Sequence, residues 1–156
     1  MKLHLVRHGN AEDTSKNGQD FDRSLSKKGI NQTLNLGVYL NPKIDGCEVW
    51  WSDSVRTRET LESISKTCTL YQPRYFIDLY LCSKQDLLNH IWKRKSNEDL
   101  LIIGHNFGIS DLLTYFVDDS IEMRTSEYYC IDFGALASNE SFQGTGTITD
   151  QYHPQV

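Results

Sequence analysis

The chain opens with an apolar run that ends in a cation and an imidazole: residues 3–9 read LHLVRHG. The aliphatic residues predict a short buried strand, and Gly9 permits a sharp exit from that strand. In an open α/β sheet, residues at the carboxyl end of such a strand project into a crevice at the sheet edge. We therefore expect Arg7 and His8 to lie side by side in that crevice.

Two distant segments carry matching chemistry. Residues 52–60, SDSVRTRET, open a predicted helix, so Arg56 would lie near the first turn, where backbone N–H groups and the helix dipole favour an anion. Residues 100–108, LLIIGHNFG, form an aliphatic strand that delivers His105 to a second strand-to-helix corner. Singly, each segment has an ordinary structural interpretation, as a satisfied histidine or a capped helix with solvated arginines. Together they place four candidates at three corners of one sheet: Arg7, His8, Arg56 and His105.

In this order and at this spacing, the segments around His8, Arg56 and His105 resemble the histidine phosphatase superfamily, also called the phosphoglycerate mutase-like fold. Three further segments are similar to the small phosphohistidine phosphatases of the SixA type: residues 22–29 (DRSLSKKG), the Leu79-Tyr80 pair, and Met123-Arg124-Thr125 ahead of a strand at 129–133. The resemblance covers residues 1–133. It implies that fold, a phosphatase activity, and a phosphohistidine-bearing signalling or sugar-transport domain as the partner.

The residues themselves can perform this chemistry. A neutral imidazole at His8 can attack phosphorus with one nitrogen while an acceptor holds its other N–H, which gives a phosphohistidine that water later hydrolyses. Arg7, Arg56 and His105 would surround the phosphoryl oxygens and stabilise the charge that develops on them. The resemblance implies the same roles for these four positions. We therefore expect a phosphohistidine phosphatase that needs no metal and no cofactor.

The general acid is the uncertain member of the site. Larger members of the superfamily carry a glutamate acid in an insertion after the third strand, whereas here Asp78 occupies the comparable region, with Glu12 and Asp13 as rival candidates. An alkoxide leaving group needs a proton, but imidazole, with a reference pKa of about 6.5, leaves with little help. A site poor in acids therefore favours phosphohistidine on a protein as the substrate. Two alternatives stay open: a small-molecule or sugar phosphate monoesterase on the same fold, and a non-catalytic phosphate-binding module.

Length and composition bound the other possibilities. The 156 residues suit a single domain spanning residues 1–156, and the net charge of −5 argues against nucleic acid as a partner. No apolar run is long enough to cross a bilayer, and the first residues lead into a strand, not a signal peptide, so we expect no membrane association and a cytoplasmic location. The four cysteines are scattered without a Cys-x-x-Cys pair, which predicts neither a zinc site nor a disulfide framework. The oligomeric state is not predicted.

Strands alternate with helices along the chain, which predicts a three-layer α/β/α sandwich with a mostly parallel central sheet. The expected strands are 2–7, 47–51, 74–78, 100–104 and 128–134, and the expected helices are 27–40, 54–67, 84–95 and 108–117. Residues 144–148 could add an edge strand, followed by a loose polar end.

Three local expectations accompany this outline. Ile30, Leu34 and Val38 have helical spacing and predict the buried face of the first helix. The basic run 93–95 suits the solvated carboxyl end of a helix. The polar segment 10–22 is expected to be an exposed loop beside the site.

Overall fold

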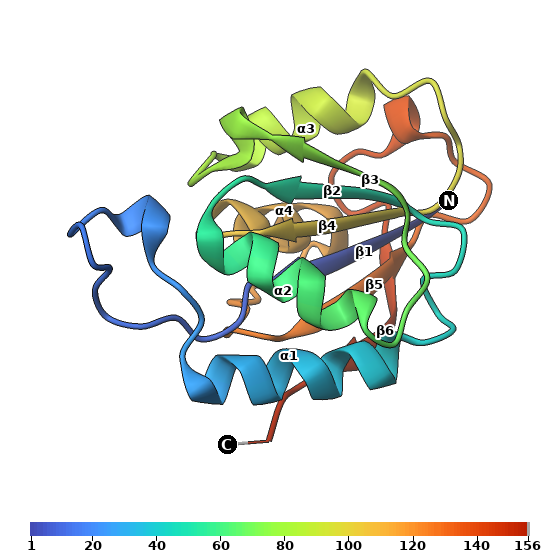
Figure 1. The fold of residues 1–156 in the computed structure, drawn as a ribbon. Coiled ribbons are helices and arrows are strands. Elements are labelled where there is room, and N and C mark those ends of the chain that lie inside the picture. Colours follow the sequence, from blue (N-terminus) through green and yellow to red (C-terminus); the bar gives the residue numbers. More distant parts are fainter. Residues whose placement is uncertain (156) are drawn as a thin grey trace.

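A six-stranded sheet forms the centre of the molecule, with strands in the order β3-β2-β4-β1-β5-β6 (Figure 1). The structure is a computed structural model that describes residues 1–155. The first four strands in this order are parallel to one another, β5 pairs antiparallel with β1, and β6 pairs antiparallel with β5. The strands are β1 (Lys2–Arg7), β2 (Glu48–Ser52), β3 (Tyr71–Phe76), β4 (Leu100–Gly104), β5 (Tyr128–Asp132) and β6 (Thr147–Tyr152).

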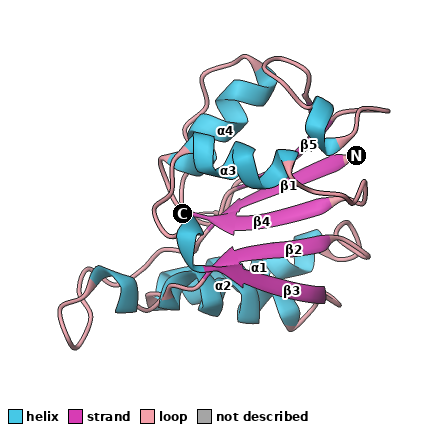
Figure 2. Ribbon diagram, turned by 90° about the horizontal axis from the view of Figure 1, so that it is seen from above, coloured by secondary structure: helices cyan, strands magenta, loops and turns pink. Residues whose placement is uncertain are grey.

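Helices cover both faces of this sheet. Figure 2 shows α1 (Lys27–Leu40) and α2 (Val55–Ser65) on one face, and α3 (Lys84–Trp92) and α4 (Gly108–Val117) on the other. Three short 3-10 turns lie in the connections, at Asp20–Asp22, Ile77–Leu79 and Ser138–Glu140. The predicted three-layer sandwich with a mostly parallel sheet is therefore confirmed.

The hydrophobic core has two halves, one on each face of the sheet. Side chains alternate along β1, so Leu3 and Leu5 pack against α3 and α4 while Val6 packs against α1 and α2. β4 is buried along its whole length, as its uninterrupted aliphatic sequence predicts for a central parallel strand.

The strand order brings three strand ends to one edge of the sheet. In the β1–β4 pair, Arg7 lies opposite Gly104, and in the β2–β4 pair, Trp51 lies opposite Ile103. The chain leaves β1 toward α1 on one face and leaves β4 toward α4 on the other face. A crevice therefore opens between the carboxyl ends of β1 and β4, where ligands bind in open α/β sheets.

The buried face of α1 is not the one that its aliphatic spacing predicts. Ile30 and Val38 are 41% and 64% exposed, and the helix buries a face that contains Gly29, Thr33 and Gly37 together with leucines. A Cβ at Gly29 would lie 2.0 Å from the Asn10 carbonyl oxygen, so the helix sits too close to its neighbours for large side chains there. The buried face of α1 is therefore determined by how closely the helix approaches its neighbours, and not by hydrophobicity alone.

The basic run at 93–95 is also only partly solvated. α3 ends at Trp92, and the Arg94 side chain turns inward, is 3% exposed, and forms an ion pair with Glu48 at 3.0 Å. A paired arginine can be buried in this way because its hydrogen bonds replace those to water.

The carboxyl-terminal strand lies later in the chain than expected. β6 spans Thr147–Tyr152 instead of 144–148, since Gly144 has a φ of 70° and belongs to the preceding turn. The polar end beyond it makes contacts: His153 lies 2.8 Å from a Glu127 carboxylate oxygen. Among residues 1–155, no helix has the length and apolarity needed to cross a membrane.

Candidate active site

His8 follows the last residue of β1 and is held in one orientation. Its Nδ1 lies 2.8 Å from the Gly9 carbonyl oxygen. A carbonyl can only accept, so Nδ1 carries the proton and Nε2 keeps its lone pair. Burial, together with the positive charges of Arg56 and Arg7, lowers the pKa of His8 to about 3. The imidazole is therefore neutral near pH 7 with one basic nitrogen available.

Gly9 makes the turn beside His8 possible. A Cβ at this position would lie 2.7 Å from a methyl carbon of Thr33, which is closer than side chains tolerate. The Gly9 N–H donates to the Thr60 hydroxyl at 3.0 Å, and this bond ties the exit of β1 to α2.

Arg7 is fixed by one of its nitrogens and leaves another without a partner. Its Nη1 donates to the Met123 carbonyl at 2.8 Å, and the Asn106 amide donates to the same oxygen at 3.0 Å. The buried Arg7 Nε has no hydrogen-bond partner within residues 1–155. A buried donor without a partner is costly, so this atom is ready for an anionic ligand.

Arg56 lies in the first turn of α2, as its position in the sequence predicts, and is 3% exposed. Ser54 is the N-cap residue of this helix. The Arg56 guanidinium reaches across to the loop after β1, where Nη1 donates to the Asp20 carbonyl at 2.7 Å and Nη2 donates to the Asp20 carboxylate at 3.0 Å.

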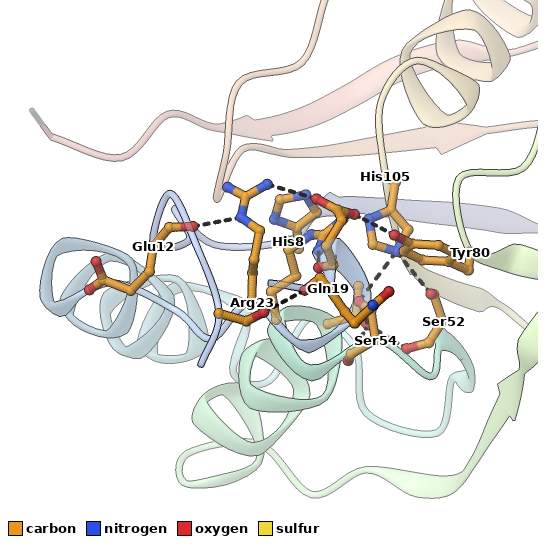
Figure 3. A network of polar contacts seen from close by, with 12 residues as sticks. His8, Glu12, Gln19, Arg23, Ser52, Ser54, Tyr80 and His105 are labelled. Atoms are coloured by element: carbon orange, nitrogen blue, oxygen red, sulfur yellow. Dashed lines mark hydrogen bonds and ion pairs between the residues drawn. The ribbon is translucent and has the colours of Figure 1, made fainter. Parts of the chain in front are cut away.

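His105 follows β4 and faces His8, with the two ring centroids 5.1 Å apart. Its Nε2 lies 2.8 Å from the Ser52 hydroxyl and 3.5 Å from the Ser54 hydroxyl (Figure 3). Burial, together with the charges of His8 and Arg56, lowers the pKa of His105 to about 2. The buried Nδ1 has no hydrogen-bond partner in the described part of the chain. Like Arg7 Nε, it is therefore available to a ligand.

These side chains share one cavity of about 410 Å³. The structure thus brings all four predicted residues together: Arg7, His8, Arg56 and His105. Three guanidinium groups and two carboxylates line the cavity, because Arg23, Asp13 and Asp20 join the predicted arginines. The site therefore has a local excess of positive charge in a protein whose net charge is −5. Within residues 1–155, no three His, Cys, Asp or Glu side chains are arranged to hold a metal ion.

The three candidate acids are separated by the fold. Asp13 lines the cavity. Asp78 does not: it follows β3 in the short 3-10 turn, is 62% exposed, and pairs with His90 at 2.8 Å. Glu12 contributes its carbonyl oxygen to Arg23 Nε at 2.6 Å, while Figure 3 shows its carboxylate pointing away from His8. The placement therefore favours Asp13 over Asp78 and Glu12.

Four further residues belong to the site and were not predicted for it: Ser52, Asp20, Arg23 and Tyr80. The Asp20 carboxylate accepts from Arg23 Nη1 at 2.9 Å and from the Tyr80 hydroxyl. Arg23 and Tyr80 lie within segments that carry the family resemblance, which was the available signal for them. The sequence contains no such signal for Asp20, because aspartates are common in polar loops.

Comparison with known proteins agrees with this geometry. The family model of the histidine phosphatase superfamily (branch 1) matches residues 3–76, which contain Arg7, His8 and Arg56. No curated protein matches the sequence.

Similar solved structures extend the comparison to the whole chain. SixA from Agrobacterium tumefaciens has a TM-score of 0.85 at 17% identity, with 98% of this chain and 97% of that chain covered. SixA from Nakamurella multipartitia has a TM-score of 0.84 at 20% identity, with coverage of 99% and 96%. A protein histidine phosphatase SixA complexed with tungstate has a TM-score of 0.80 at 20% identity, with coverage of 97% and 96%. At these identities the likeness establishes a common fold. The chain is thus similar to the histidine phosphatase superfamily in sequence over residues 3–76, and to the SixA structures in fold over nearly its whole length.

Proposed function

We propose that this protein is a phosphatase that removes the phosphoryl group from phosphohistidine on a partner protein, through a covalent phosphohistidine at His8. The proposal rests on the tautomer of His8. Its Nδ1–H is fixed on the Gly9 carbonyl, so a neutral Nε2 with a lone pair is left beside a cavity lined by Arg7, Arg56 and His105. This arrangement has the parts of an activated nucleophile facing an anion site.

The reaction has two displacements at phosphorus. In the first, His8 Nε2 forms a bond to phosphorus while the bond between phosphorus and the substrate imidazole breaks. The bonding electrons stay on that imidazole, which takes a proton from solvent. In the second, water attacks the phosphorus on His8, the bond to Nε2 breaks with its electrons returning to His8, and the proton of the water passes to solvent. The products are inorganic phosphate and an unmodified histidine.

The unpartnered polar atoms support a role in binding phosphoryl oxygens. Arg7 Nε is a donor, and His105 Nδ1 is one when Ser52 donates to Nε2. Phosphoryl oxygens in the cavity would accept from both atoms and would receive charge stabilisation from Arg56. Because these groups are already fixed by the fold, little reorganisation is needed as charge develops in the transition state.

The rim of the cavity fits a protein substrate better than a small sugar phosphate. Leu81 lines the cavity and is 53% exposed, and Phe107, next to the cavity residue Asn106, is 70% exposed. Large apolar side chains at the mouth of a site are typical of surfaces that contact another protein.

A small-molecule or sugar phosphate monoesterase remains the second candidate function. The position of Asp13 favours it. An alkoxide leaving group needs a proton, and Asp13 is the one candidate acid that lines the cavity. Asp13→Asn should therefore slow an alkyl phosphate more than a phosphohistidine protein. Asp78→Asn serves as the control, because Asp78 lies outside the cavity and should affect neither substrate.

The deciding experiment measures phosphate release from a panel of phosphohistidine proteins, sugar phosphates and aryl phosphates. We expect the highest kcat/KM for a phosphohistidine protein, and loss of turnover in His8→Ala. Reactions with labelled substrate, denatured at alkaline pH to preserve phosphohistidine, should show an acid-labile, alkali-stable label on the wild-type protein and none on the variant. Faster turnover of monoesters would favour the second candidate. Phosphate binding without turnover of any substrate would indicate a non-catalytic module.

A further inference from the structure

Asp20 occupies the hydrogen-bond donors that a phosphoryl group would need. Its carboxylate accepts from Arg56 Nη2 at 3.0 Å, from Arg23 Nη1 at 2.9 Å and from the Tyr80 hydroxyl. Its backbone carbonyl accepts from Arg56 Nη1 at 2.7 Å. The cavity that contains His8 is thus already partly neutralised by an anion that the chain itself supplies.

The carboxylate is ionised at working pH. The Tyr80 hydroxyl and the guanidinium groups of Arg23 and Arg56 hold the pKa of Asp20 well below its usual range. Asp20 therefore carries a full negative charge whenever a phosphoryl group, which carries negative charge itself, enters the cavity.

Asp20 is also far more exposed than its main partner, Arg56. The Asp20 side chain is 45% exposed and stands on the 3-10 turn of the loop after β1. The Arg56 side chain is 4% exposed and projects from α2. The Asp20 carboxylate and an incoming phosphoryl group compete for the same guanidinium, and their like charges repel. When phosphate arrives, Asp20 is the group that gives way.

We propose that Asp20 is a resident anion that exchanges with the phosphoryl group, and that it thereby weakens the retention of inorganic phosphate and favours product release. In the empty site it keeps Arg56 and Arg23 in place. This inference rests on the proposed function, since it requires the cavity to receive a phosphoryl group.

The test is calorimetric titration of inorganic phosphate into the wild-type protein and its variants. Asp20→Asn keeps the shape and an acceptor oxygen but removes the charge, so it should lower the Kd for phosphate about tenfold or more. Asp20→Glu restores the charge and should return the Kd toward the wild-type value. If Asp20 contributed only its shape, Asp20→Glu and Asp20→Asn would instead have similar Kd values for phosphate.

Asp22→Asn is the matched control. Asp22 lies on the same 3-10 turn and pairs with the Asn17 amide at 2.6 Å, away from the cavity. Removing its charge, which lies outside the cavity, should change the Kd for phosphate by less than about twofold, because solvent and salt screen it. Thermal unfolding of each variant verifies that it is folded.

The outcomes separate the two proposals. If Asp20→Asn binds phosphate as weakly as the wild type or more weakly, Asp20 only holds the loop and the exchange is wrong. Arg56→Ala tests the cavity itself. If it binds phosphate as well as the wild type, the cavity is not the phosphate site and the proposed function fails. If Arg56→Ala loses phosphate binding while Asp20→Asn binds phosphate no more tightly than the wild type, only the proposed role of Asp20 fails.

Discussion

Ser52→Ala is the most informative change that leaves every proposed phosphate-binding residue in place. Ser52 is fully buried at the end of β2, and its hydroxyl lies 2.8 Å from His105 Nε2. Its backbone carbonyl accepts from the Thr57 hydroxyl, and alanine preserves that bond. The substitution therefore removes one hydrogen bond and leaves a buried ring nitrogen without its partner.

The size of the effect follows from that single bond. A buried polar atom left unsatisfied costs about 1–3 kcal/mol. If this cost appears in the orientation and tautomer of His105, kcat/KM falls by about 5- to 160-fold, since each 1.36 kcal/mol is tenfold in rate. The free energy of unfolding should fall by no more than the same amount.

The assay compares kcat/KM for the wild type, Ser52→Ala, His105→Ala and the double variant. If Ser52 acts through His105, the double variant is no slower than His105→Ala alone, because residues in one network are not additive. Ser54→Ala is the matched control: Ser54 lies 3.5 Å from the same nitrogen and bonds mainly to the Thr57 hydroxyl, at 2.8 Å. A loss below twofold in Ser52→Ala, or a larger loss in Ser54→Ala, would refute this reasoning.

Three other outcomes are expected. Arg56→Lys keeps the charge but loses the planar fork that uses two nitrogens, so kcat/KM should fall about tenfold or more, and wild-type activity of the lysine variant would exclude a bidentate role. EDTA should leave phosphohistidine turnover unchanged, whereas inhibition that a divalent metal reverses would contradict the proposed mechanism. Burial lowers the pKa of His4 to about 4, so the unfolded chain binds more protons below pH 6.5. Stability is then full above pH 6.5 and is lost toward pH 4 at up to about 1.4 kcal/mol per pH unit for this group. Denaturant titrations at several pH values should show a shallower loss in His4→Gln, and equal slopes in the two proteins would show that His4 does not titrate on unfolding.

The sequence could predict where the functional side chains gather because a parallel sheet limits where they can go. Arg7, His8 and His105 come at or directly after apolar strands, and Arg56 opens the helix after another. Strands that run parallel have their carboxyl ends at one edge, so residues from three segments far apart in the chain had to meet. No detailed contact was needed for this prediction.

Contacts between loops lie beyond such reasoning. The loop of residues 10–22 returns to the site because Glu12 N–H donates to the Ser24 carbonyl at 2.9 Å and Ala11 forms a bridge with Leu25. Nothing in a polar loop specifies that return, so the place of Asp20 depends on tertiary structure. Ser52 lies two residues before Ser54, the N-cap residue of α2, and the sequence does not distinguish the two serines. Which of the two serines bonds to His105 is seen only from the distances of their hydroxyls to that ring, 2.8 Å for Ser52 and 3.5 Å for Ser54.

The anchoring of the three arginines explains why these unpredicted residues matter. Arg7 is held by the Met123 carbonyl, Arg23 by the Glu12 carbonyl, and Arg56 by Asp20. The first two anchors are neutral and do not compete with phosphate, so these arginines can bind it without losing them. Arg56 also donates to the Asp20 carboxylate, which Arg23 shares, so in the proposed exchange both arginines give up this charged partner. The proposed exchange therefore makes the affinity for phosphate depend less on the number of arginines than on the Asp20 carboxylate that two of them share, whose charge a single substitution removes.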